Sequence, residues 1–210
     1  MRLLLIDTDV FVLLAAGGLI DRVAELLGFE PSQVRRLYPV ENQLTRGRSF
    51  KDRYPEAVRQ TALAKAKLVT PLTDRPTNDA MLQKLAVSDI DEGEALMFAL
   101  VAENPSWLLT TGDRCSLVAL ATNPDLKDVC GALTGRLVCI ETVLRLLVVT
   151  DGVEKIAAAF SSVREANQKL RVIFSEANAT NLDSCLEGID SYLAALRRAV
   201  GDHLLYDGSK

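Results

Sequence analysis

Histidine is almost absent from this sequence of 210 residues, which contains only His203. The four cysteines, Cys115, Cys130, Cys139 and Cys185, form no C-x-x-C pair. A structural zinc site needs closely spaced cysteine and histidine ligands, so these spacings exclude one. We expect a cytoplasmic protein with reduced thiols.

Long apolar runs are also missing. The N-terminal stretch from Leu3 to Ile20 is apolar, but Asp7 and Asp9 interrupt it. The stretch is therefore too short and too charged to cross a bilayer or to act as a signal peptide. We expect no membrane partner.

Several familiar catalytic signatures do not occur. The chain has no G-x-G-x-x-G, no G-x-x-x-x-G-K-[ST], no G-x-S-x-G and no H-E-x-x-H. Aromatic residues make up only 5% of the chain, so no stacking platform for single-stranded RNA is visible. The sequence therefore lacks the common motifs of nucleotide-binding proteins, serine hydrolases and zinc peptidases.

What the sequence does contain is an alternation of short apolar runs and helical patterns. Leu3–Ile6 is a continuous apolar run that ends at Asp7, which is typical of a strand buried on both faces of a parallel sheet. Trp107–Leu109 and Leu137–Ile140 have the same character, and Lys67–Leu72 is a weaker candidate. Helical patterns separate them at Leu19–Leu27, Glu56–Leu68, Asp79–Leu85 and Glu94–Ala102. This alternation predicts an α/β fold.

The C-terminal part has a different pattern. Two long stretches, opened by Asp151-x-x-Glu154 and by Thr180-x-x-Asp183, carry apolar residues at steps of three and four. We predict a first domain at residues 1–149 and a helical hairpin at residues 150–210. Asn167 falls on the apolar seam of the first helix, where a polar residue can fix register or oligomeric state.

Charge is distributed unevenly along the chain. The 24 basic and 28 acidic residues give a net charge of −4, so no overall positive field predicts a nucleic-acid partner. Residues 31–70 carry a net charge of +6, however, and the remainder therefore carries −10. This basic segment is either a solvated helical face or a surface for phosphates.

Two aspartates stand where predicted strands end. Asp7 and Asp113 need solvent, a partner or a metal, because burying an isolated carboxylate costs several kcal/mol. The plainer interpretation is that such residues cap helices, a role we would assign to Asp9 rather than to Asp7, and to Asp113 for the helix after it.

Four acidic residues, taken in their sequence context, resemble the PIN-domain family of metal-dependent nucleases. Their spacings are 34, 53 and 19 residues, and the four motifs are Ile-Asp7-Thr-Asp-Val, Val-Glu41-Asn-Gln-Leu, Asp-Glu-Gly-Glu94-Ala-Leu and Leu-Leu-Thr-Thr-Gly-Asp113-Arg. Gly135-Arg-Leu-Val-Cys-Ile-Glu-Thr-Val-Leu resembles the closing strand and helix of the family. The likeness covers about residues 1–149. One departure is Asp9, where the family usually has Asn or Ser.

The resemblance implies a PIN-like parallel sheet of about four or five strands flanked by helices. It also implies that Asp7, Glu41, Glu94 and Asp113 are the catalytic residues and hold Mg²⁺ or Mn²⁺. Asp91 and Glu94 lie three residues apart on one helix face, and we prefer Glu94 because the family places its acid after the glycine.

The residue types suit this chemistry independently. Hard divalent cations take oxygen ligands, and two such ions can activate water and offset the charge on a phosphodiester. We expect an endoribonuclease that hydrolyses RNA. Arg46, Arg48, Lys51 and Arg53 follow Glu41, and Arg114 follows Asp113, so these five are the predicted RNA-binding residues.

Partners follow from the resemblance. Many PIN proteins are toxins of toxin–antitoxin pairs, so an antitoxin protein is a candidate partner beside the role of an accessory nuclease. PIN-like nucleases often self-associate, and we lean to a homodimer formed by the hairpin rather than a hairpin packed on its own domain.

Two other functions remain open. Asp7-Thr-Asp9 also matches the nucleophile and general acid of haloacid-dehalogenase-type phosphatases, although the later acidic motif of that family is absent. A catalytically inactive PIN-like module that binds RNA or protein is the second alternative.

Overall fold

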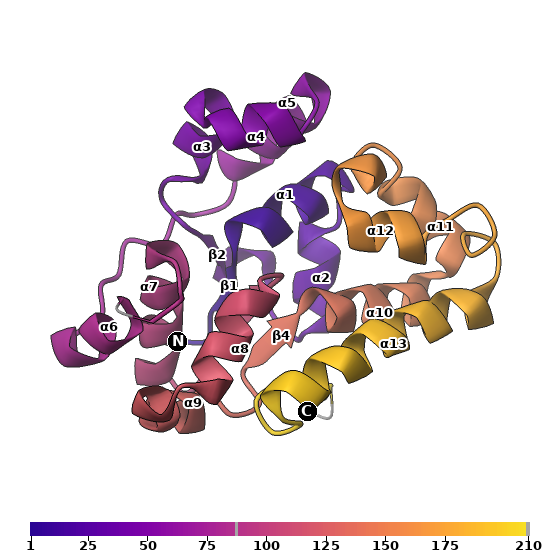
Figure 1. The fold of residues 1–210 in the computed structure, drawn as a ribbon. Coiled ribbons are helices and arrows are strands. Elements are labelled where there is room, and N and C mark those ends of the chain that lie inside the picture. The colour runs from indigo at the N-terminus through magenta and orange to yellow at the C-terminus, as the bar shows by residue number, and fades with distance from the viewer. Residues whose placement is uncertain (87, 209–210) are drawn as a thin grey trace.

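A computed structural model describes residues 1–86 and 88–208, and its centre is a parallel sheet (Figure 1). The four strands are β1 (Leu4–Ile6), β2 (Val34–Arg36), β3 (Leu108–Thr111) and β4 (Leu137–Cys139), in the order β2-β1-β3-β4. The predicted α/β class and the parallel sheet are confirmed. The weak candidate at 67–72 supplies only an isolated bridge between Arg36 and Pro71.

The apolar runs form strands because they are buried on both faces. All three residues of β1 are buried, and Leu4 pairs with Val34 on one side and with Leu108 on the other. β3 and β4 are paired through Thr111 and Cys139. Since every strand is parallel, the carboxyl ends of all four meet at one edge of the sheet.

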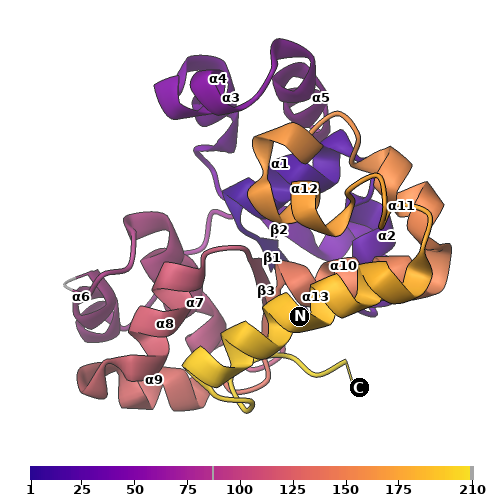
Figure 2. The same cartoon turned by 45° about the vertical axis from the view of Figure 1, so that its right-hand side comes forward.

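Helices surround this sheet in three groups (Figures 1 and 2). The first group follows β1 and β2, the second precedes and follows β3, and the third follows β4. Their bounds are α1 (Thr8–Ala16), α2 (Ile20–Leu26), α3 (Val40–Arg46), α4 (Arg48–Arg53), α5 (Glu56–Ala66), α6 (Asp79–Ala86), α7 (Glu92–Glu103), α8 (Arg114–Thr122), α9 (Lys127–Ala132), α10 (Ile140–Asp151), α11 (Val153–Ala159), α12 (Gln168–Ile173) and α13 (Leu182–Val200). The four helical patterns predicted before residue 103 correspond to α2, α5, α6 and α7.

The predicted C-terminal hairpin is wrong in its first half. α10 runs through Val149, so the expected boundary lies inside a helix, and short elements replace the long helix that was expected. Gly152, at φ 90°, ends α10 and precedes α11. Asn167 is extended and its side chain accepts a hydrogen bond from Leu170 N at 3.1 Å, so it caps α12 and does not occupy a seam. The apolar pattern marks burial correctly, but turns between short helices satisfy it as well.

The C-terminal segment packs on the rest of the chain. α13 lies against α10 and α8. Beyond it, Gly135 N donates to His203 O at 2.9 Å, and Tyr206 N donates to Leu137 O at 2.8 Å. These contacts join residues 150–208 to the edge strand β4.

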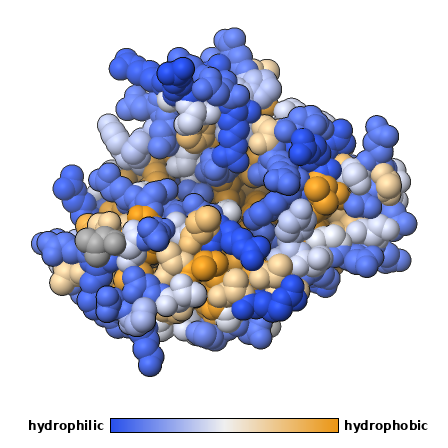
Figure 3. Space-filling view, in the orientation of Figure 1, coloured by the Kyte–Doolittle hydropathy of each residue, from blue (hydrophilic) through white to orange (hydrophobic). Residues whose placement is uncertain are grey.

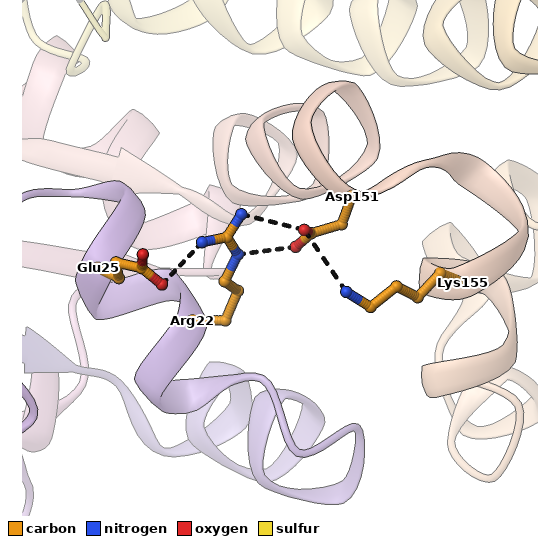
Figure 4. Close-up of polar contacts among 4 residues, drawn as sticks. All are labelled: Arg22, Glu25, Asp151 and Lys155. Atoms are coloured by element: carbon orange, nitrogen blue, oxygen red, sulfur yellow. Dashed lines mark hydrogen bonds and ion pairs between the residues drawn. The ribbon is translucent and has the colours of Figure 1, made fainter.

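An ion-pair cluster makes a second connection at the far end of α10 (Figure 4). Arg22 on α2 donates to both oxygens of Asp151 at 2.9 and 3.0 Å and to Glu25 at 2.7 Å. Lys155 lies 3.5 Å from Asp151. α2 and the α10–α11 junction are thereby held together.

Two further features concern membrane-spanning helices and cysteine pairing. Within the described part of the chain, no helix is both long and apolar enough to cross a membrane. All four cysteines are free thiols.

We predict that α13 stabilises the whole fold. Leu196 is buried against the core, whereas Leu182 on the same helix is exposed. Leu196→Ala should lower the free energy of unfolding by about 2–4 kcal/mol through a lost contact and a cavity, and Leu182→Ala by less than about 1 kcal/mol. Urea unfolding followed by the fluorescence of Trp107, which lies beside β3, measures both. A Trp107 transition that Leu196→Ala leaves unchanged would show that α13 is energetically separate.

Candidate metal centre

The carboxyl edge of the sheet opens into a cleft of about 1870 Å³. Figure 3 shows the recess in the middle of this face, below the hydrophilic surface of α3–α5 and above α8. The lining residues come from α1, from α3 and α4, from α6–α8 and from the start of α12. The cleft is thus enclosed by elements from the whole chain, including its C-terminal segment.

Three carboxylates converge in this cleft. One oxygen from each of Asp91, Glu94 and Asp113 lies within 4.8 Å of the other two. Asp91 caps α7 by accepting a hydrogen bond from Glu94 N at 2.9 Å. Asp113 caps α8 by accepting from Cys115 N at 2.6 Å and from Ser116 N at 3.1 Å. Two helix N-termini therefore hold the cluster in place.

Glu94 is the buried member of the cluster. Ser116 Oγ donates a hydrogen bond to its Oε2. Burial raises the pKa of Glu94 from 4.5 to about 8, and the negative charges of Asp113, Asp7 and Asp91 act in the same direction against the Ser116 hydrogen bond. The carboxylate is therefore poorly stabilised unless a cation offsets its charge.

Asp7 lies beside this cluster at the end of β1. It is the N-cap of α1 and accepts from Thr8 N at 2.5 Å, so our assignment of that cap to Asp9 is wrong. Burial, the neighbouring charge of Asp9 and the charges of Asp91 and Asp113 raise the pKa of Asp7 to about 7. Asp9 itself pairs with Arg53 at 2.6 Å.

The structure does not bring Glu41 to the carboxylate cluster. Its side chain is 43% exposed and accepts from Nη2 of Arg36, a buried guanidinium in β2. Arg36 also donates to Ala66 O at 2.7 Å and to Leu37 O at 3.1 Å. Glu41 thus offsets a buried positive charge.

The choice between Asp91 and Glu94 as the acidic residue of the site does not arise, because both belong to the cluster.

The positive side chains of the cleft agree only in part with those predicted. Of the five predicted RNA-binding residues Arg53 and Arg114 line it, whereas Arg46, Arg48 and Lys51 are exposed and do not line it. The basic side chains at the cleft are Arg53, Arg75, Arg114 and Lys169.

Sequence patterns could have indicated only some of these side chains. Arg53 and Arg114 are predicted because they follow the acidic motifs closely in sequence, whereas Arg75 is not. Lys169 lies 56 residues after Asp113, and no sequence motif near it indicates a place at the site.

The cleft wall also contains two aromatic residues, the exposed Tyr38 and the partly buried Phe50. Aromatic surface is therefore available beside the carboxylates although the overall aromatic content is low.

The donor set suits a hard divalent cation. Asp91, Glu94 and Asp113 offer oxygen atoms only, and hydrogen bonds from backbone amides and a hydroxyl hold them. Hydrogen bonds of this kind orient ligands without neutralising them. Burial is the main cause of the raised pKa of Glu94, and the charges of the neighbouring carboxylates add to it.

Comparison with known proteins identifies no relative. No family model, no curated protein and no solved structure matches this chain.

We predict that the metal-free protein loses stability as pH rises, because the folded state holds the Glu94 proton more tightly than the unfolded chain. The free energy of unfolding should fall between about pH 4.5 and pH 8, the interval between the two pKa values. Glu94→Gln, which is neutral at every pH, should exceed the wild type at pH 8 by at least about 1.4 kcal/mol, the equivalent of one pKa unit. Urea unfolding in a chelator measures this.

The matched control is Glu92→Gln, an exposed glutamate in the same first turn of α7. It should leave the pH profile unchanged. A wild type more stable than Glu94→Gln at pH 8 would contradict the raised pKa.

Proposed function

We propose that this protein is a metal-dependent endoribonuclease that hydrolyses RNA phosphodiester bonds with Mg²⁺ or Mn²⁺. One observation carries the proposal: the carboxylate oxygens of Asp91, Glu94 and Asp113 converge within 4.8 Å in a large cleft at the carboxyl edge of a parallel sheet. Basic side chains line the same cleft. Acids beside cations suit a site that holds a divalent ion and a polyanion together.

The proposed roles follow from the contacts. Asp91, Glu94 and Asp113 would hold the ion, with Asp7 next to them. A bound divalent cation would supply an activated water and offset the charge that develops on the phosphate. Arg53 and Arg114 would hold flanking phosphates, and the cleft walls would orient the strand.

The resemblance to PIN-domain nucleases gives additional, weaker support. Asp7, Glu94 and Asp113 are three of its four acidic positions, and they line one cleft. The fourth position, Glu41, is engaged by Arg36, so Asp91 replaces it in the proposed ligand set.

The alternatives account for less of the site. A phosphatase would use Asp9 as its general acid, but Arg53 holds Asp9 at 2.6 Å, and that mechanism explains neither Asp91 nor Glu94. An inactive binding module would have no use for three converging carboxylates. The cleavage experiment below distinguishes the inactive module from an enzyme.

The biological setting stays a prediction. A toxin role, with an antitoxin as partner, depends on the family resemblance alone, and a short reading frame immediately upstream of the gene would support it. The homodimer also stays a prediction that depends on the family resemblance, because short helices stand in place of the first helix of the expected hairpin. Cytoplasmic location is likewise a prediction.

We predict that Mn²⁺-dependent cleavage of RNA requires the carboxylate cluster. Loss of a residue that only orients a metal ligand typically costs 10- to 100-fold in activity. Loss of a proposed ligand itself should cost more, so Asp91→Asn and Asp113→Asn should each lower kcat by at least about 100-fold. The same variants should weaken Mn²⁺ binding in calorimetry. Glu41→Gln, outside the cluster, should stay within about threefold of the wild type.

Cleavage is measured on labelled single-stranded and structured RNA, with a chelator as the blank. Absence of Mn²⁺-dependent cleavage of any RNA, together with crystals soaked in Mn²⁺ that hold no ion between Asp91 and Asp113, would overturn the proposed function. Strong loss in Glu41→Gln with an intact Asp91→Asn variant would instead restore the ligand set predicted from sequence.

We also predict that RNA contacts the cleft rather than the outer face of α3 and α4. Arg114→Ala removes a cleft cation and should weaken binding about three- to tenfold, with a salt slope smaller by about 0.7. Arg48→Ala removes an exposed cation outside the cleft and should change neither. Fluorescence anisotropy in Ca²⁺ measures the affinity and the salt slope of both variants. Weaker binding by Arg48→Ala with unchanged binding by Arg114→Ala would show that RNA contacts the exposed basic segment instead.

A further inference from the structure

Glu141 is a buried acid that the proposed chemistry does not use. It follows β4, the strand that pairs with β3. Thr111 of β3 lies opposite Cys139 of β4, and Asp113 and Glu141 each come two residues later, so the two acids hold equivalent positions at the ends of neighbouring strands. The Glu141 side chain is 3% exposed. A carboxylate in this position costs several kcal/mol unless something compensates its charge.

Lys169 is the residue that compensates it. Its Nζ donates to Glu141 Oε1 at 2.6 Å, whereas Glu141 Oε2 is buried and has no hydrogen-bond partner among the described residues. Lys169 is also 27% exposed and lines the cleft. An ammonium group has three donors, and Glu141 Oε1 accepts only one of them.

The surrounding backbone fixes this lysine in place. Asn167 caps α12 through Leu170 N, which sets the start of the helix that carries Lys169. Asn167 and Gln168 line the cleft together with it. Figures 1 and 2 both place α12 beside α1, on the opposite side of the sheet edge from α6 and α7. Lys169 therefore belongs to a different wall from Asp91 and Glu94.

A purely structural role explains this arrangement poorly. Buried ion pairs contribute little net stability, and a neutral or apolar pair of similar size is often as stable. A free lysine side chain loses conformational entropy when a ligand immobilises it, which costs binding free energy. Glu141 holds Lys169 in one place before a ligand binds, which lowers that cost.

We propose that Lys169 is a phosphate-binding residue contributed by the C-terminal segment, and that Glu141 is the residue that positions it. The inference rests on the proposed nuclease function and adds to it a subsite for a phosphodiester that flanks the scissile one. RNA is a chain of phosphates, and those next to a cluster of carboxylates need a cation of their own.

The test uses the full-length protein and a labelled single-stranded RNA of about 12 nucleotides, in Ca²⁺, over roughly 50 to 200 mM salt. Lys169→Met alone would leave Glu141 buried and unpaired, so the main variant combines Lys169→Met with Glu141→Gln. The control is Lys155→Met, which removes another carboxylate-paired lysine, bound to Asp151 away from the cleft.

The double variant should bind about three- to tenfold more weakly, with a salt slope smaller by about 0.7. Lys169→Arg, which keeps the positive charge, should retain most of the affinity of the wild type. Glu141→Gln alone should weaken binding without changing the slope, since the charge remains but is no longer positioned. In cleavage assays with Mn²⁺ the double variant should raise KM and leave kcat nearly unchanged.

The two proposals can fail separately. A folded double variant that binds and cleaves like the wild type overturns the subsite while the nuclease stands. Weakened binding by the double variant, in a protein that never cleaves RNA, supports the subsite and overturns the nuclease. A wild type that does not bind RNA overturns both.

Discussion

Like charges held together at one edge of a parallel sheet are the constraint on which the rest of this structure depends. The strands bring Asp7, Asp113 and Glu141 to their shared carboxyl end, and the start of α7 adds Asp91 and Glu94. Burial, and after it mutual repulsion, raise the pKa of both Asp7 and Glu94. Such an edge is tolerable only where each carboxylate receives a donor or a counter-charge.

The structure supplies these partners in different ways. Backbone amides at helix N-termini serve Asp7, Asp91 and Asp113, and Ser116 serves Glu94. Lys169 serves Glu141 with a full positive charge. Amides and hydroxyls orient a carboxylate without cancelling its charge, whereas an ammonium group cancels it. Asp7, Asp91, Glu94 and Asp113 therefore keep more uncompensated negative charge than Glu141, which favours the proposed cation site beside them.

The sequence predicts the strands that are purely apolar and the acids at their ends, but it hides interactions that exist only after folding. The sequence does not predict β2, because Arg35 and Arg36 interrupt its apolar pattern. Arg36 can be buried because Ala66 O, 30 residues away in sequence, and Leu37 O accept hydrogen bonds from its guanidinium group. That same arginine engages Glu41, which looked like a ligand in its local motif. Asp91 was identified as an alternative ligand because its helical spacing from Glu94 is a local property.

The C-terminal segment shows the same limit on a larger scale. Its apolar spacing identifies buried residues, but a pattern of three and four cannot distinguish one long helix from short helices joined by turns at Gly152 and Asn167. The sequence pattern consequently predicts a separate helical extension. In the structure α13 packs on the core while the start of α12 forms a wall of the cleft. Because one segment supplies both burial and a cleft cation, the stability of the fold and the composition of the site depend on each other.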